Sequence, residues 1–420
     1  MRIFLDAHLH SKYSRATSKS MDLEHLASFA KQKGLNMLGT GDFSFPAWLD
    51  ELKQKLKPIG DSGIFVYKDI YWILTTEVNT VYKQENRMRK VHHLIFVPDF
   101  EVVSEVNEML SKYGDLSVDG RPTLKLSSPE LVENLIEICP SILVIPAHCW
   151  TSWYGALGEF SGFNSLEECY QDQAKHVYAL ETGMSSDPSM NFRVSSLNKF
   201  TLVSFSDAHS FWTWRIGREN VCFDLKEISY QEIFKAIKNK DRKKILFTVE
   251  TPPPYGRYHY TGHRTCGINL HPREAIKLNN ICPKCGRKLT VGVLQRVEEL
   301  ADRPEGFVPK DAIPFKTLLP LYEIISFALG IGELYSKRVL QEHDKLIERF
   351  GNELNVLLNV PKEELVKVTD EKIADAIIRV REGKVNYISG YDGIYGKVVF
   401  DEKFELKKEK FQYQKNLRQF

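Results

Sequence analysis

The 420-residue chain has little of what marks a membrane protein or a disulfide-rich secreted protein. No apolar run reaches the roughly 18 residues that a membrane-spanning helix needs. The seven cysteines are too few and too scattered for a disulfide framework. The first residues, MRIFLDAHLH, lack the layout of a signal peptide. We therefore expect a cytoplasmic protein with reduced thiols and no membrane partner.

The chain also lacks a strong excess of either charge, since its net charge is only +2 at pH 7. Positive charge is instead local. Residues 251–290 carry seven Lys or Arg against one Glu, and residues 402–420 carry six against three. Such a stretch is often only a solvated surface, so its meaning depends on the sites beside it.

The pattern of apolar residues predicts an α/β protein. Up to about residue 250, strand-like runs such as 35–41 and 141–148 alternate with helical stretches such as 21–34, 128–140 and 229–240. This order favours an α/β barrel or a doubly wound sheet. Residues 151–175 interrupt it with a long loop, which we expect to cover a site.

The second half of the chain has a different organisation. Residues 251–263 are predicted to be a stiff, proline-rich linker, and a small module follows at 259–310. From about residue 313 the spacing becomes helical, and residues 388–400 predict a turn with short strands. We therefore expect three domains, at 1–250, 251–310 and 311–420.

Histidines and carboxylates stand at the ends of apolar runs in the first half. Strand ends meet at one rim of a parallel barrel, so these side chains predict a multi-metal site for metal-assisted hydrolysis. His8 and His10 taken alone could equally be two hydrogen-bonded core histidines. The strand-end groups are His8, His10, Asp42, Glu77, His92, His93, His148, Asp207 and His209.

The segments DAHLHSKYS, GLNMLGTGDF, TTEV, HHLIF, PAH and SDAH, in that order, resemble the PHP (polymerase and histidinol phosphatase) family. The resemblance implies a distorted (β/α)7 barrel that hydrolyses phosphoesters with up to three metal ions at its rim. It favours His93 over His92, because the family's ligand precedes a hydrophobic pair, and it makes Glu77 the bridging carboxylate. The implied ligands are His8, His10, Glu77, His93, His148, Asp207 and His209, and all of them except His93 are predicted to be catalytic.

The chain departs from the PHP pattern at two places. Phe43 stands where the family has a histidine, so that Asp42 becomes the expected ligand there. Arg15 and Ala16 occupy the region where the family has an Asp or His. We therefore expect two or three divalent ions (Zn, Mg or Mn) in the barrel, and two ions can suffice for hydrolysis.

A second metal site is predicted at 263–285. His263-x-x-Cys266 and Cys282-x-x-Cys285 supply two pairs of ligands that can close a tetrahedron around one structural zinc ion. His259 and His271 are the alternatives for the histidine ligand. Beside these sites the basic stretch indicates nucleic-acid binding. The predicted phosphate contacts are Arg264, Lys284, Arg287 and Lys288.

The whole chain is similar to the endonuclease Q family. The resemblance rests on GHRTC, CPKCGRKLTVGVLQRVEELADRPEG, LLPLYEIISFALGIG, FGNELNVLLNVP and SGYDGIYG. It implies metal-dependent nicking of DNA on the 5′ side of hypoxanthine, xanthine, uracil or an abasic site, which leaves a 3′-hydroxyl and a 5′-phosphate. The expected partner is double- or single-stranded DNA with such a lesion, and replication or repair proteins are considered as further partners.

Aromatic residues near the motifs are candidates for stacking on an extruded base, although each could instead pack a loop. Residues 321–382 could clamp the duplex or only pack together. Two other functions stay open: a small-molecule PHP phosphatase, and a non-catalytic DNA-binding repair scaffold. The aromatic candidates are Trp150, Trp153, Tyr154 and Phe211, and above all Trp212 and Trp214, with Arg215 and Arg218 beside them.

Overall fold

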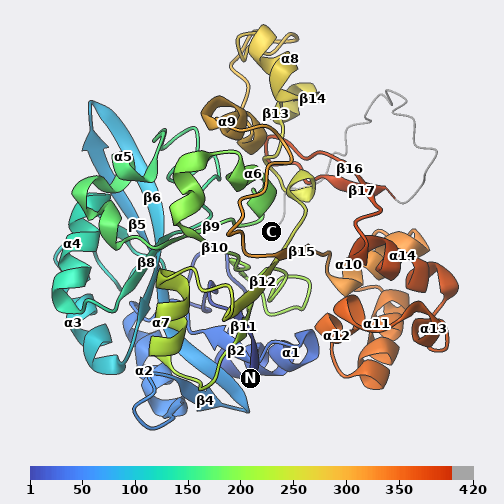
Figure 1. The fold of residues 1–420 in the computed structure, drawn as a ribbon, viewed down its shortest axis with the longest axis horizontal. Coiled ribbons are helices and arrows are strands. Elements are labelled where there is room, and N and C mark those ends of the chain that lie inside the picture. Colours follow the sequence, from blue (N-terminus) through green and yellow to red (C-terminus); the bar gives the residue numbers. More distant parts are fainter. Residues whose placement is uncertain (400–420) are drawn as a thin grey trace.

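The computed structural model describes residues 1–399, which form a mixed α/β protein around a central sheet, as the sequence predicts (Figure 1). Eleven strands of the described residues join in this sheet, and β9 (Ala179–Glu181) and β10 (Thr201–Val203) form one of three separate two-stranded sheets. The sheet contains β1 (Arg2–Asp6), β2 (Met37–Gly39), β3 (Lys57–Pro58), β4 (Phe65–Tyr67), β5 (Ile70–Gln84), β6 (Arg87–Val97), β7 (Thr123–Leu124), β8 (Leu143–Pro146), β11 (Asn220–Asp224), β12 (Ile245–Glu250) and β15 (Phe315–Thr317).

The strand pairing departs from a regular repeat of parallel strands. β1, β2 and β5 are parallel neighbours, but β1 pairs β11, β5 pairs β6 and β6 pairs β8 in antiparallel fashion. The β5–β6 hairpin turns on Glu85 and Asn86, whose φ angles of 51° and 61° suit the tightest hairpin turns. A two-residue turn leaves no room for a crossover helix, so these two strands must run in opposite directions.

Helices cover the sheet in the first 250 residues, and their ends follow the sequence signals. The first helix begins after Asp22, which accepts a hydrogen bond from the His25 amide, and ends at Gly34 with φ 98°. The fourth begins with a capping box of Ser127 and Glu130. These helices are α1 (Leu23–Lys33), α2 (Pro46–Lys55), α3 (Phe100–Ser111), α4 (Ser128–Ile138), α5 (Leu166–Tyr170), α6 (Pro188–Phe192) and α7 (Tyr230–Lys238), with short 3-10 turns at Gln171–His176 and Ser195–Lys199.

Strand side chains are buried on both faces of the sheet. Leu5 and Ile73 join one apolar cluster, while Leu38 and Leu74 join another with Leu26 of α1. Strands buried on both faces read as continuous apolar runs, and that is why the sequence showed runs here instead of alternation. Polar side chains interrupt or follow these runs, and several of them converge in the candidate metal centre described below.

Residues 253–310 make a small module. Residues 261–277 project at the top of Figure 1, whereas Val293 and Val297 pack in the large apolar cluster that also contains Leu26 of α1. The module's own apolar cluster has only three buried members, Ala275, Cys282 and Leu289. So small a core supplies little folding free energy. The module contains β13 (Thr261–His263), β14 (Ile268–Leu270), α8 (Pro272–Lys277) and α9 (Val293–Leu300), with 3-10 turns at Pro253–Tyr255 and Arg264–Cys266.

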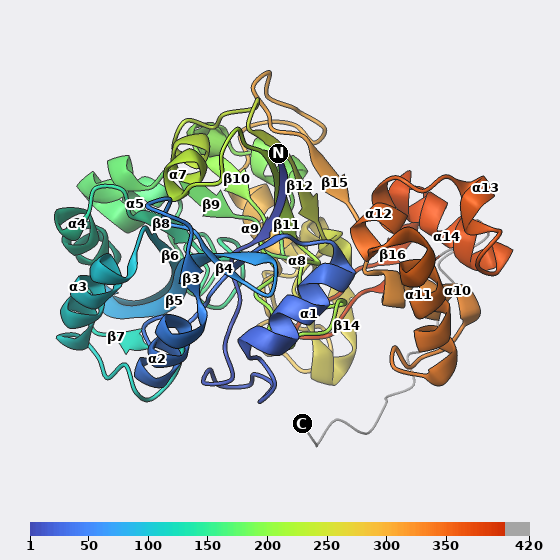
Figure 2. The ribbon, with the colours of Figure 1, turned by 90° about the horizontal axis from the view of Figure 1, so that it is seen from below.

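A group of helices lies to one side of the sheet in both views (Figures 1 and 2). The prediction of a helical region from 311 needs one correction, because β15 at 315–317 returns to the central sheet beside β12. No helix of residues 1–399 is long and apolar enough to cross a membrane. The basic stretch 402–420 lies outside the described residues. The later elements are α10 (Leu321–Leu329), α11 (Lys337–Phe350), α12 (Glu353–Leu358), α13 (Lys362–Leu365), α14 (Glu371–Arg381), β16 (Asn386–Ile388) and β17 (Lys397–Val399).

Candidate metal centre

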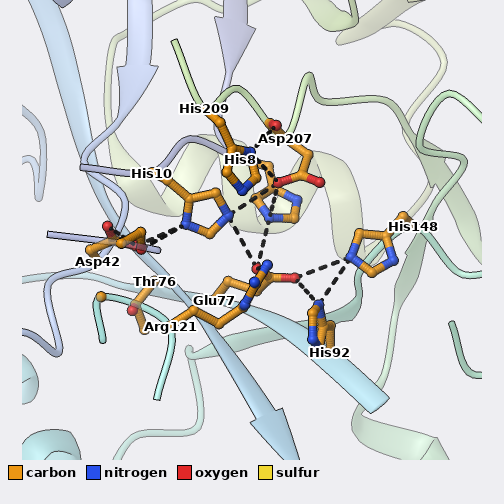
Figure 3. Close-up of polar contacts among 12 residues, drawn as sticks. His8, His10, Asp42, Thr76, Glu77, His92, Arg121, His148, Asp207 and His209 are labelled. Carbon is orange, nitrogen blue, oxygen red and sulfur yellow. Dashed lines mark hydrogen bonds and ion pairs between the residues drawn. The ribbon is translucent and has the colours of Figure 1, made fainter. Parts of the chain in front are cut away.

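Four predicted ligands converge from the segment after β1, the middle of β5 and the segment after β10 (Figure 3). His10 Nε2 lies 3.2 Å from Glu77 Oε2 and 3.1 Å from Asp207 Oδ1. His8 Nε2 lies 3.5 Å and 3.6 Å from the same two oxygens. Two imidazoles and two carboxylates that face one point are a donor set suited to a divalent cation.

A second group shares Glu77 with the first. Its other carboxylate oxygen, Oε1, lies 2.7 Å from His92 Nδ1 and 3.2 Å from His148 Nε2. The two nitrogens are 3.2 Å apart. Glu77 therefore stands between two candidate ion sites with one oxygen directed at each, which is the arrangement that a bridging carboxylate needs.

The preference for His93 as a ligand is wrong. Adjacent residues of a strand point to opposite faces, so only one of the two histidines can face Glu77, and it is His92. The His93 ring is buried on the other side, where Nδ1 lies 2.9 Å from Tyr170 Oη and Nε2 lies 3.0 Å from Thr80 Oγ1. His93 is a hydrogen-bonded core histidine.

The charges of the first group indicate that a cation belongs there. Burial lowers the pKa of His8, but the carboxylates of Glu181 and Glu77 outweigh burial and hold it well above its usual range. Although burial raises the pKa of Glu77, nearby His92 and Arg121 hold it well below the usual value. His8 Nε2 is buried without a hydrogen-bond partner among the described residues. A divalent ion would occupy that lone pair and balance the carboxylates.

Asp42 does not join the converging group, although the sequence made it an expected ligand. Its Oδ1 lies 3.1 Å from His10 Nδ1, on the far side of the imidazole from the cluster. Its Oδ2 accepts hydrogen bonds from the Ser11 amide at 2.6 Å and the Ser14 hydroxyl at 2.9 Å. Both oxygens are engaged, so Asp42 orients His10 instead of reaching an ion. Phe43 is fully buried in the core.

The sequence missed two charged residues of the site. Glu181, the last residue of β9, lies 3.0 Å from His8 Nδ1 and accepts the His148 amide at 2.6 Å. It follows the apolar run YAL, so the strand-end signal could have found it. Arg121 donates to Glu77 Oε2 at 3.1 Å from a loop, and nothing in its local sequence marks it.

His209 lies at the open edge of the cluster, with a side chain about one third exposed. Its ring centroid is 4.5 Å from that of His10, and its Nδ1 lies 2.9 Å from the backbone oxygen of Asp207. Nδ1–H then donates to that oxygen, and Nε2 keeps a free lone pair. His148 and Asp207 have positive φ angles of 30° and 47°, a strain that the surrounding contacts hold in place.

The second predicted metal site is also assembled. The ligand atoms of His263, Cys266, Cys282 and Cys285 lie within 4.8 Å of one another. Neither alternative histidine joins them: His259 is buried against Tyr260, and His271 caps α8. All seven cysteines are free of disulfides.

The residues predicted to hold DNA fall into two groups. The exposed ones lie around the thiol cluster, and Lys284 Nζ donates to the Cys266 carbonyl at 2.7 Å. The prediction that Trp214 stacks on a base is wrong, because it is buried between Trp212 and Tyr322 with ring centroids 4.7 and 4.8 Å away. Trp212 packs against Phe29, and Arg218 donates to the Ser206 carbonyl, so both stabilise the loop after Asp207. Arg215 is half-buried in the same loop. The exposed residues are Arg264, Lys284, Arg287 and Lys288.

Comparison with known proteins gives matches over nearly the whole chain. The chain is 36% identical to the lesion-specific endonuclease PfuEndoQ of Pyrococcus furiosus, with a TM-score of 0.86 over 97% of this chain and 98% of that one. It is 35% identical to endonuclease Q in a complex with a 27-mer duplex that has an abasic lesion at the active site. The TM-score is again 0.86, over 97% and 100% of the two chains.

Two uncharacterized proteins are also similar. MJ0043 of Methanocaldococcus jannaschii is 34% identical over 281 residues, and the match spans 65% of this chain but only 34% of that longer protein. YqxK of Bacillus subtilis is 28% identical over 416 residues, which are 94% of this chain and 99% of that one. The family model of the MJ0043 C-terminal domain matches residues 320–384, the segment of α10–α14.

Proposed function

We propose that this chain, which belongs to the endonuclease Q family, is a DNA repair endonuclease that cuts the phosphodiester bond 5′ to a deaminated base or an abasic site. The observation that carries the proposal is the similarity over 97% of the chain to endonuclease Q on a duplex with an abasic lesion at the active site. The products are a 3′-hydroxyl and a 5′-phosphate, and the substrates include hypoxanthine, uracil and xanthine lesions.

The converging side chains support metal-assisted hydrolysis at the rim of a seven-stranded PHP barrel. His8, His10, Glu77 and Asp207 would hold one divalent ion, and Glu77, His92 and His148 a second. Bound there, the ions would activate water and neutralise charge on the phosphate in the transition state.

The chain's own charged groups orient these ligands and the substrate. Asp42 and Glu181 fix the rings of His10 and His8 through Nδ1, so that each Nε2 faces the cluster. Arg121 keeps a cationic guanidinium beside Glu77, where it can also hold a phosphate oxygen. The free Nε2 of His209 lies at the open edge, where the scissile phosphate enters.

A nicking assay tests the proposal. Duplexes with one inosine, uracil or abasic site are incubated with the full chain and Mg²⁺ or Mn²⁺, and the cut is mapped at nucleotide resolution. We expect one cut 5′ to the lesion and none in a matched duplex. Cutting on the 3′ side or no cutting would contradict the proposal.

The same experiment separates the two rival functions. A small-molecule phosphatase would turn over a simple phosphomonoester and leave lesion DNA intact, and it would not need residues 251–399. A non-catalytic scaffold would bind lesion DNA without cutting, and elemental analysis would find one zinc ion and none in the barrel.

We further propose that His263, Cys266, Cys282 and Cys285 bind one structural zinc ion that holds the module at 251–310 together. The projecting part of this segment has an apolar cluster of only three buried side chains, which is too small a core, and zinc binding can contribute about 10–16 kcal/mol to folding. The exposed basic residues around the cluster would then contact DNA phosphates, so binding should weaken steeply with salt.

Cys282→Ser is expected to remove one zinc ion per chain and to expose the module to limited proteolysis, while the rest of the protein resists. Elemental analysis and mass spectrometry of the fragments measure both effects. Cys139→Ser, which changes a half-buried thiol elsewhere, is the control and should keep the full zinc content. Unchanged zinc in the Cys282 variant would rule out this site.

A further inference from the structure

A pair of aromatic rings stands in solvent on the loop that follows His148, which we name the aromatic loop (residues 150–163). Trp153 is 48% exposed and Phe160 is 43% exposed. The two rings stack on each other with centroids 3.5 Å apart and planes 13° apart. Together they present a continuous aromatic surface, which is costly to leave in water unless something covers it.

Hydrogen bonds from other segments hold the aromatic loop in one conformation, and its two rings are exposed in that conformation. Arg296 of α9 is buried and donates to the backbone oxygens of Leu157 at 3.2 Å and Phe163 at 3.1 Å. Ser152 donates to the Val291 oxygen at 3.0 Å. These contacts come from the LTVGVLQRVEELADR segment, and they hold the two rings out toward solvent in one arrangement.

The loop is also attached to the candidate metal centre. The His92 amide donates to the Tyr154 oxygen at 3.0 Å, and the rings of these two residues stack with centroids 4.4 Å apart. His148 Nδ1 lies 2.7 Å from Thr151 Oγ1. In the sequence, Trp153 thus lies between two residues that each contact a candidate ligand.

Positive charge flanks the aromatic surface. Lys90 is exposed with its Nζ 5.8 Å from the Tyr154 ring centroid, and exposed Arg87 donates to the Glu159 oxygen at 2.8 Å. Aromatic rings for bases with cations for the backbone are the combination by which proteins hold a single strand of nucleic acid. An apolar protein partner would gain nothing from these cations.

We propose that the Trp153–Phe160 pair is a stacking platform for one unpaired base of the DNA strand that is cut, within a few nucleotides of the scissile phosphate. This inference rests on the proposed endonuclease function and adds to it the contact that holds the distorted strand beside the lesion. Stacking does not distinguish base edges, so one platform serves several lesions and sequence contexts.

The test combines variants of the two aromatic residues with removal of single bases from the DNA. Nicking and DNA affinity are measured for Trp153→Ala and Phe160→Ala on inosine duplexes in which each nucleotide near the lesion is replaced in turn by an abasic analogue. We expect each variant to lose about 10- to 100-fold in affinity on the intact strand, as one lost stacking contact would cause. When the base that stacks on the platform is the one removed, wild type and variant should bind the duplex equally, because neither can then make the contact.

Two further variants separate stacking from packing. Trp153→Phe should keep most of the affinity and Trp153→Leu should not, although both should melt with the wild type because the replaced ring is exposed. Phe307→Ala, which removes another exposed aromatic ring, should bind normally. Bound DNA should also protect Trp153 from acrylamide quenching, since it is the exposed tryptophan of the chain.

The failure of this inference differs from failure of the proposed function. If wild type nicks lesion DNA but both alanine variants match it and no base couples to them, the platform is wrong and the endonuclease stands. If wild type neither binds nor nicks lesion DNA, the proposed function itself fails.

Discussion

Glu77→Gln is expected to reduce DNA nicking by about 10³-fold or more, because both candidate ion sites depend on this one carboxylate. An amide keeps the shape of the side chain but presents one neutral oxygen instead of two charged ones. It also leaves the Arg121 guanidinium and the imidazoles of His92 and His148 without their counter-charge. Single-turnover nicking and the metal content of the purified variant are the measurements.

The controls separate loss of metal from loss of fold. Glu232 lies on α7, outside the cluster, and forms a partly buried ion pair with Lys244. The Glu232→Gln variant loses this pair and should nick normally. Asp207→Asn should abolish nicking while it leaves DNA binding largely intact, because Asp207 contributes to the first ion site alone. A Glu77 variant that kept its metal and its activity would contradict the bridging role.

Most groups of the candidate site follow apolar runs in the sequence, as the prediction expected. Glu77 and His92, however, lie within β5 and β6 and not at strand ends. The choice of His93 over His92 was wrong because adjacent residues of a strand face opposite sides of the sheet. Glu77 faces the site from β5, and its cross-strand neighbours on β6 set which histidine shares that face. Register between two strands is a tertiary property, and a family pattern of residue order does not carry it.

One residue of the site, Asp42, was given the wrong role, and another, Arg121, was missed. Asp42 follows a strand as a ligand would, but the Ser11 amide and the Ser14 hydroxyl satisfy its carboxylate behind His10. Arg121 reaches Glu77 from a loop with no pattern of its own. Distances between loops depend on how the whole chain packs, so local sequence could not supply them.

The aromatic residues show the same limit. Trp212 and Trp214 follow SDAH and were the favoured candidates for base stacking. Tyr322 of the helical group covers Trp214, however, and Trp212 packs against Trp214 and Phe29. Trp153 was one candidate among several, and only the fold shows that it is the exposed one beside the metal centre. Exposure is decided by what other segments cover, and the covering segment here lies more than a hundred residues further along the chain.

Lys33→Met is expected to lower the free energy of unfolding by about 3–5 kcal/mol, the usual cost of leaving a buried charge without its partner. Lys33 lies in α1 at 2% exposure, and Glu353 begins α12 at 0%. Lys33 Nζ donates to Glu353 Oε1 at 2.7 Å and to the Thr213 carbonyl at 2.8 Å. One ammonium group therefore joins the sheet domain, the loop after Asp207 and the helical group.

The pH dependence of this pair has a definite sign. Burial raises the pKa of Glu353, but Lys33 and the neighbouring His343 together outweigh burial and lower it to about 2. A carboxyl whose pKa is lower in the folded state stabilises the fold above its unfolded pKa, and that contribution is lost as pH falls toward 2. The loss in wild type should begin near pH 4.5 and be smaller in the Lys33→Met variant, which lacks the ammonium group that lowers the pKa of this carboxyl.

Denaturant unfolding at pH 7 and pH 4 measures both effects, with Lys31→Met as the matched control. Lys31 lies on the same helix and pairs with Asp69 in solvent, so its loss should cost less than about 1 kcal/mol. Adding Glu353→Gln to Lys33→Met should recover part of the stability, since the amide oxygen can still accept the Leu321 amide without a buried charge. Equal losses in the Lys31 and Lys33 variants would mean that the buried pair does not hold the helical group against the sheet domain.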